Sequence, residues 1–163
     1  SLRGAAAKHN PDAAFLLGRL PIGLADEDAV KGKRALVVED GPTVTHGGMG
    51  YGAGLLAAKR AGAAELVAPR AYAKGQIAEA FGNYTHLSSV LPALGYGTEQ
   101  LADLEATIAA VPCDVVVVGT PIDLGRIVKI DKPAARVTYT YAETEEPGLA
   151  GIVRERFLPK VQS

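Results

Sequence analysis

The sequence predicts an α/β protein built as a three-layer sandwich, with a mostly parallel sheet between helices. Two apolar runs, residues 35–38 and 115–118, carry this prediction, because short apolar runs bounded by turn residues are typical of buried parallel strands. An Ala-rich helical pattern over residues 51–61 follows the first run and leads to another expected strand, residues 65–68. Strand, helix and strand in this order form the βαβ unit of a parallel sheet.

The other elements follow from local signals. We expect a short strand at 13–17, a short helix at 26–31 that ends at Gly32, a Gly-rich loop at 41–50, a helix at 76–84 and a loop with one helical turn at 85–96. A cleaner helix begins near Thr98, its candidate N-cap, and a last, edge or half-exposed strand covers 135–141 before a final helix at 144–157. This order suits a Rossmann-like or P-loop-NTPase-like topology.

Composition limits the classes of function. The 163 residues suit one α/β domain, 1–163, and the net charge of −1 gives no reason to expect nucleic acid or a membrane surface as a partner. No apolar run approaches the roughly 20 residues that cross a bilayer. The single cysteine, Cys113, has no partner for an internal disulfide and is expected to be a small core residue, so a cytoplasmic location fits.

Two adjacent carboxylates, Glu39 and Asp40, end the first apolar run. A carboxylate at the carboxyl end of a parallel strand is suitably placed to hold Mg²⁺, directly or through water. Neighbouring residues of a strand point to opposite faces, so one of the two is expected to face the site. The alternative is a solvated strand end, or a carboxylate that caps backbone amides of the next loop.

The segment after these carboxylates has the composition of an anion-binding loop. Gly47 and Gly48 allow backbone N–H groups to face a phosphate, and the hydroxyl groups of Thr43 and Thr45 can donate to its oxygens. His46 can donate a hydrogen bond or move a proton. The segment is not a Walker A loop, because the chain contains no Gly-Lys-Ser/Thr; the alternative is a flexible turn with a structural histidine.

A third polar segment, residues 119–123, follows the second apolar run. Thr120 and Asp123 have the spacing of the guanine-recognition loop of GTPases, with Pro121 where that loop has lysine. The alternative is that Asp123 caps a short helix, and the spacing taken by itself favours this alternative.

Taken together, these segments resemble a known family. Residues 37–49 closely resemble a motif of the cyclic 2,3-diphosphoglycerate synthetases and their bacterial relatives, which are often labelled predicted GTPases. The resemblance continues in family order over further blocks and covers about residues 10–142: 51–54, 69–70, 91–97, 118–124, 132–133 and 136–137. The family's members are much longer, and their preceding region carries a Gly-Lys-Ser/Thr loop, so this chain resembles the carboxyl-terminal part.

The resemblance implies part of an enzyme that uses ATP or GTP with Mg²⁺. The archaeal synthetase closes 2,3-diphosphoglycerate into a cyclic phosphoanhydride with ATP, so the implied partners are a nucleotide, a small phosphorylated substrate and a preceding P-loop-bearing domain or subunit. The implied roles are metal binding by Glu39 or Asp40, catalysis by Asp40 and His46, and contacts to nucleotide or substrate by a further set: Thr43, Thr45, Gly47, Gly48, Thr120 and Asp123.

Two other functions stay open. The chain could instead be a non-catalytic domain that binds a small anion or assembles subunits, and pairing of the expected strand at 135–141 would allow a homo-oligomer. A Rossmann-type enzyme with a nicotinamide or acyl substrate is the weaker alternative, because Glu65 begins the second strand of the βαβ unit instead of ending it.

Overall fold

The computed structural model describes residues 1–46 and 48–158, which divide into two compact units. The larger unit is Ile22–Thr138, and the smaller one combines Ser1–Pro21 with the chain from Tyr139 onward. The described part of the smaller unit contains four elements: α1 (Leu2–His9), β1 (Gly18–Arg19), β8 (Ala142–Glu143) and α6 (Gly148–Arg156).

In the smaller unit, β1 and β8 pair antiparallel, with Gly18 opposite Glu143. The strand expected at 13–17 is therefore misplaced: the strand is Gly18–Arg19, and Leu17 just before it accepts hydrogen bonds from the backbone N–H and the hydroxyl of Thr144. The final helix begins at Gly148 rather than at 144, and the Glu143 carboxylate accepts a hydrogen bond from the N–H of Leu149 there.

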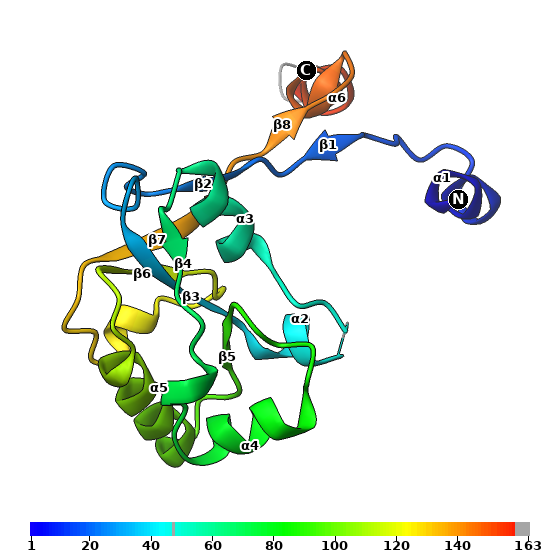
Figure 1. The fold of residues 1–163 in the computed structure, drawn as a ribbon. Coiled ribbons are helices and arrows are strands. Elements are labelled where there is room, and N and C mark those ends of the chain that lie inside the picture. The colour runs from blue at the N-terminus through cyan, green and yellow to red at the C-terminus, as the bar shows by residue number, and fades with distance from the viewer. Residues whose placement is uncertain (47, 159–163) are drawn as a thin grey trace. The chain divides into compact units, whose positions relative to one another are not determined.

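The larger unit holds a six-stranded sheet with the order β2-β7-β6-β3-β4, and β5 also pairs with β3 (Figure 1). Its strands are β2 (Ile22–Leu24), β3 (Arg34–Asp40), β4 (Glu65–Leu66), β5 (Leu91–Ala93), β6 (Val115–Val118) and β7 (Ala134–Tyr139), the last of which ends at the boundary with the smaller unit. Its α-helices are α2 (Gly41–His46), α3 (Ala53–Arg60), α4 (Gly75–Asn83) and α5 (Thr98–Ala110), with short 3₁₀ turns η1 (Arg70–Tyr72) and η2 (Leu124–Arg126).

The sheet is mixed but mostly parallel. Strand β3 pairs parallel with β4, β5 and β6, and β6 pairs parallel with β7. Strands β2 and β7 run antiparallel. Just after β2 the N–H of Ala25 donates to the carbonyl of Arg136, and just before β2 the carbonyl of Pro21 accepts from the N–H of Thr140. The α/β class is confirmed. The sequence predicts an edge or half-exposed strand for β7; it lies between β2 and β6, so it is not an edge strand, but alternate residues are exposed as predicted.

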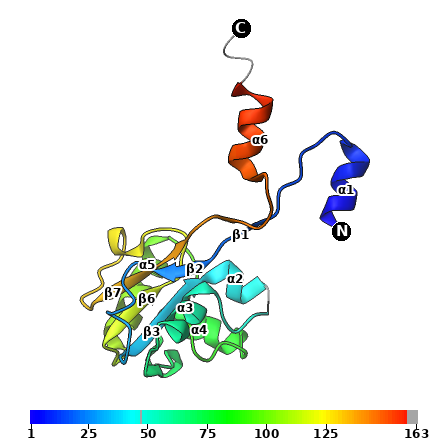
Figure 2. The ribbon, with the colours of Figure 1, turned by 90° about the horizontal axis from the view of Figure 1, so that it is seen from above.

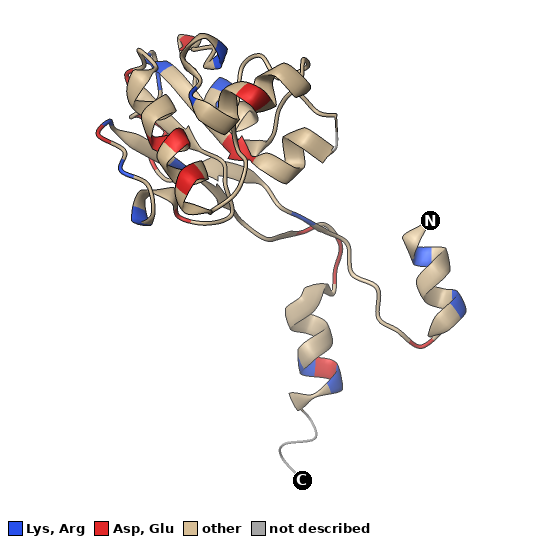
Figure 3. Cartoon of the chain, turned by 90° about the horizontal axis from the view of Figure 1, so that it is seen from below, with Lys and Arg blue, Asp and Glu red and all other residues tan. Residues whose placement is uncertain are grey.

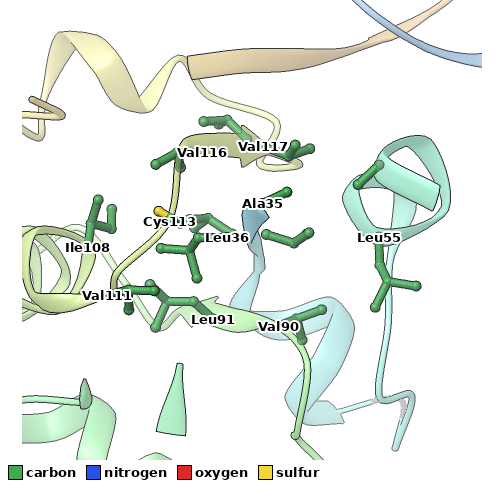
Figure 4. Packing of buried hydrophobic residues seen from close by; sticks show 14 of the residues in the cluster. Ala35, Leu36, Leu55, Val90, Leu91, Ile108, Val111, Cys113, Val116 and Val117 are labelled. Carbon is green, nitrogen blue, oxygen red and sulfur yellow. The ribbon is translucent and has the colours of Figure 1, made fainter. Parts of the chain in front are cut away.

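The core forms on both faces of the central strands, because strand residues alternate between faces. Figure 4 shows Leu55 of α3 and Ile108 of α5 on opposite sides of β3 and β6. Ala35 and Val37 belong to the face covered by α3, whereas Leu36 and Val38 belong to the other face. All residues of β6 are buried, which confirms the prediction of a central strand.

Three local predictions are wrong. Residues 41–46 form α2 instead of a loop, because Val44 is fully buried and fixes this segment against the core; β3 leads directly into this helix (Figure 2). Residues 85–96 contain β5, whose Pro92 is tolerated because this strand pairs only with β3. Residues 26–31 are turns rather than a helix, and the Asp26 carboxylate accepts from the N–H of Ala29 there.

The predicted core position of Cys113 is confirmed: the residue is buried, and burial raises the pKa of its thiol. Among the described residues, no helix is both long and apolar enough to cross a membrane.

Candidate active site at the carboxyl edge of the sheet

Three strands of the larger unit end at the same edge. Val38 of β3 lies opposite Leu91 of β5 on one side and Val118 of β6 on the other. The segments that follow these strands, from Asp40, at 94–97 and at 119–123, therefore meet at the carboxyl edge. Open α/β sheets bind their ligands at this edge.

Glu39 faces α3 and is closed off from solvent. Its side chain is 1% exposed, and its Oε1 accepts hydrogen bonds from the N–H of Gly52 at 3.1 Å and of Leu55 at 2.8 Å. Burial raises the pKa of Glu39, while these backbone donors act in the opposite direction. The carboxylate thus caps backbone amides, as one alternative from the sequence held, but at the amino end of α3 rather than in the next loop; its role as a metal ligand stays a prediction.

Two glycines make room for this buried carboxylate. A Cβ atom added at Gly52 or at Gly119 would lie 2.5 Å from Oε2 of Glu39, closer than side-chain carbons approach other atoms. The glycines before α3 and after β6 therefore allow close packing around Glu39, in addition to any part that they play in binding a ligand.

Asp40 lies on the opposite face and is partly exposed. Its Oδ2 accepts a hydrogen bond of 3.3 Å from the hydroxyl of Thr43. Tyr96, from the segment after β5, lies near enough that the Asp40 charge adds to burial in raising the pKa of the phenol. The structure thus brings Asp40, Thr43 and Tyr96 together at an accessible position, and Tyr96 is a candidate site residue that the motifs did not single out.

The other residues predicted to bind phosphate lie on or after α2. The hydroxyl of Thr45 donates to the carbonyl of Gly41 at 2.8 Å, so its oxygen is able to accept from Nδ1 of His46, 3.1 Å away. His46 is exposed, and Gly48 has a positive φ of 63°. Gly47 lies outside the described residues. The phosphate contacts and the catalytic role of His46 stay predictions.

His86, from the segment between α4 and β5, contacts the backbone of α2. Its Nε2 lies 2.8 Å from the carbonyl oxygen of Val44, and because a carbonyl only accepts, Nε2 carries the proton and donates. Its ring also meets the ring of Tyr84 edge to face, with centroids 6.1 Å apart. His86 is therefore suited to position the helix that carries Thr43 and Thr45.

Thr120 and Asp123 follow β6. Thr120 is 5% exposed and its hydroxyl donates to the carbonyl of Ile122, which closes the turn. Asp123 occupies the N-cap position of η2, but its side chain makes no capping hydrogen bond. Contacts of these two residues to a nucleotide stay predictions.

A cavity of about 200 Å³ adjoins this turn. Its lining is contributed by the end of β6, the turn and β7: Val118, Asp123, Gly125, Ile130, Ala134 and Arg136. Nη2 of Arg136 donates to the carbonyl of Pro121 at 2.8 Å, and Nη1 lies 4.0 Å from Oδ2 of Asp123.

Two basic residues of the family-like blocks serve the fold. Lys132 donates to three carbonyls at the end of α5: those of Ile108, Ala109 and Val111. Arg70 donates to three carbonyls at and after the end of α4, those of Phe81, Thr85 and Leu87, and lies over the ring of Phe81. Over the larger unit, basic and acidic residues are otherwise interspersed (Figure 3).

The carboxylates that the structure describes at this edge are few. No group of three or more His, Cys, Asp or Glu side chains among the described residues is able to hold an ion. Mg²⁺ usually takes one or two carboxylates together with substrate phosphates and waters. Asp40 supplies one accessible carboxylate of this kind.

One curated relative matches this chain. ArcE, an arginine synthetase from Thermococcus kodakarensis, is 49% identical to it over 154 residues, which are 94% of this chain and 34% of the relative. The chain thus spans about a third of the length of this relative. No family model and no solved structure matches the chain.

Proposed function

We propose that this chain is a domain of a nucleotide-dependent ligase whose Mg²⁺–nucleotide phosphates bind at the carboxyl edge of the sheet. The observation that carries the proposal is the open position of Asp40, which has the hydroxyl of Thr43 beside it. The similarity to an enzyme named a synthetase supports the same class of reaction and offers arginine as the amino acid that is made or consumed.

In this proposal Asp40 binds Mg²⁺, and Thr43, Thr45, Gly47 and Gly48 contact the phosphates. His46 holds or moves a proton, and Thr120 and Asp123 line the substrate side. Glu39 supports the site by fixing α3 instead of binding the metal. The magnesium ion, when bound, neutralises phosphate charge during transfer.

Four narrower features of the enzyme are proposed as well. They are the choice between ATP and GTP, the formation of a cyclic phosphoanhydride or nucleotide hydrolysis, a Rossmann-like or P-loop-like three-layer topology, and a cytoplasmic location. A P-loop-bearing region is proposed to accompany this chain, and the greater length of the arginine synthetase leaves room for one.

The test is turnover by the full-length protein that contains this chain. Consumption of ATP and of GTP is measured with Mg²⁺, with and without L-arginine. We expect the preferred nucleotide to turn over and Asp40→Asn to lower the rate at least about 100-fold, since the loss of an electrostatic contact to phosphate in a transition state has effects of this order. Asp28→Asn, in an exposed turn, is the matched control. Absence of both nucleotide binding and turnover in the wild type contradicts the proposal.

A subunit-assembly domain is the second candidate, and α6 favours it. Leu149, Val153 and Phe157 are 49%, 40% and 62% exposed and recur at every fourth residue, so they share one face. Val153→Asp distinguishes the two candidates. Sedimentation measures assembly and the rate of nucleotide consumption measures turnover; loss of assembly with unchanged turnover supports the assembly role.

A further inference from the structure

The cavity beside β6 combines one negative, one positive and several apolar groups. Asp123 and Arg136 supply the charges, while Val118, Ile130 and Ala134 supply apolar wall. Its volume of about 200 Å³ suits a small metabolite rather than a whole nucleotide.

The two charged groups are only loosely paired with each other. Their nearest atoms are 4.0 Å apart, beyond hydrogen-bond distance, and the side chains of Arg136 and Asp123 are 46% and 50% exposed, respectively. Within the described part of the chain, the Asp123 carboxylate has no other partner. Exposed pairs of this kind add little stability, so a ligand that offers each group its own charged hydrogen bond is able to replace the pairing.

Arg136 is nevertheless held in a fixed direction. The hydrogen bond from its Nη2 to the carbonyl of Pro121 anchors one edge of the guanidinium and leaves other N–H groups available. A planar guanidinium that is fixed in this way is well suited to bind a carboxylate.

The mixture of charges favours a ligand that carries both signs. A phosphate in the cavity would meet the negative charge of Asp123, and a metal cation would meet the positive charge of Arg136. An α-amino acid satisfies both, because its ammonium and its carboxylate are bonded to the same carbon atom.

We propose that this cavity is a subsite for the α-amino and α-carboxylate groups of a free amino acid, with Asp123 accepting from the ammonium and Arg136 donating to the carboxylate. The proposal rests on the proposed function in one respect: it takes the amino acid to be the substrate or product of the ligase. The apolar wall packs against the aliphatic stem of the amino acid.

The register supports a common site with the nucleotide. Val118 of β6 lies opposite both Val38 of β3 and Arg136 of β7, so Arg136 and Asp40 belong to the same face of the sheet. An amino acid in the cavity and phosphates at Asp40 therefore lie on one face and at one edge, as joint reactants require.

The test is calorimetric titration of the full-length protein with three probes, with and without a non-hydrolysable Mg²⁺–ATP analogue. The probes are L-arginine, agmatine, which lacks the carboxylate, and N-acetyl-L-arginine, which lacks the ammonium. We expect Arg136→Gln to weaken the affinity for L-arginine about tenfold or more and the affinity for agmatine less than about twofold. Asp123→Asn is expected to weaken L-arginine by a similar factor and N-acetyl-L-arginine less than about twofold.

Asp131→Asn is the matched control, because its carboxylate pairs with Lys129 on the surface and does not line this cavity. Circular dichroism verifies that each variant is folded. Equal losses for all three probes, unchanged L-arginine affinity in both variants, or no L-arginine binding at all would each overturn the subsite. If the protein binds nucleotide but not L-arginine, only the subsite is contradicted. If the two variants weaken L-arginine binding as expected but the protein binds no nucleotide, the subsite is supported and the proposed function is contradicted.

Discussion

Glu39 and Asp40 are neighbours in the sequence but belong to different regions of the molecule. Glu39 lies on the face covered by α3, almost fully buried, and accepts hydrogen bonds from two backbone amides. Asp40 lies on the opposite face, partly exposed, and its carboxylate accepts a hydrogen bond from the hydroxyl of Thr43. Because neighbouring side chains of a strand point to opposite faces of the sheet, one carboxylate is buried and stabilises the fold while the other is open to a ligand.

The difference shows how the sheet edge is built. The buried carboxylate ties β3 to the start of α3, and the absence of side chains at Gly52 and Gly119 lets the three segments close around it. The exposed carboxylate is held on a frame that this packing has already made rigid. We therefore expect changes at Glu39 to act mainly on stability and changes at Asp40 to act mainly on binding.

The largest effect is expected for Glu39→Ala. The change leaves the N–H groups of Gly52 and Leu55 without an acceptor and opens a void, so the free energy of unfolding should fall by about 3 kcal/mol or more. Glu39→Gln keeps an acceptor oxygen and should lose about 1 kcal/mol. Urea denaturation measures both, with Glu79→Ala on the exposed surface of α4 as the control. Equal, small losses for all three variants would show that Glu39 does not cap α3.

A smaller effect is expected for Gly119→Ala. The added methyl group would press on Oε2 of Glu39 and approach the backbone nitrogen of Gly54, which should lower stability by about 1–3 kcal/mol. Gly82→Ala is the matched control, because nothing lies within 4 Å of the added Cβ there and α4 should be stabilised by about 0.5–1 kcal/mol. Thermal unfolding distinguishes the two. A shift of the same sign in both variants would contradict close packing around Glu39.

The pH dependence of stability sharpens the comparison further. Burial raises the pKa of Glu39 above its ordinary value of 4.5, so the folded state holds this proton more tightly than the unfolded chain does. The wild type should therefore lose stability relative to Glu39→Gln as the pH rises above 4.5, by at most about 1.4 kcal/mol per pH unit. Denaturation curves at a series of pH values measure the difference. If the stability of the wild type instead rises relative to that of Glu39→Gln as the pH increases, the pKa of Glu39 is lowered in the folded state.

The smallest change in stability is expected for Asp40→Asn. The side chain is partly exposed and the hydrogen bond from Thr43 at 3.3 Å is long, so the free energy of unfolding should change by less than about 0.5 kcal/mol. The same denaturation experiment measures it. A loss as large as that of Glu39→Ala would place Asp40 in the structural frame and end the distinction between the two carboxylates.

Local patterns predicted the central strands well, because β6 and most of β3 are uniformly apolar and buried. They did not reveal α2 or β5, because Val44 and Leu91 gain their burial from segments distant in the chain. The motifs drew attention to the carboxyl edge of the sheet, where the segments after β3, β5 and β6 meet. They gave Tyr96 no role, although it lies in the family-like block 91–97, since its position near Asp40 depends on the pairing of β5 with β3 rather than on spacing in the sequence.

The most direct test of the account is the affinity of the full-length protein for the Mg²⁺ complex of its preferred nucleotide, measured by calorimetry in Asp40→Asn and Glu39→Gln. The account predicts that Asp40→Asn weakens the affinity about tenfold or more while the protein stays as stable as the wild type. It predicts that Glu39→Gln lowers stability but changes the affinity of the folded protein less than about threefold. The reverse pattern, with nucleotide affinity lost at Glu39 and kept at Asp40, would contradict it.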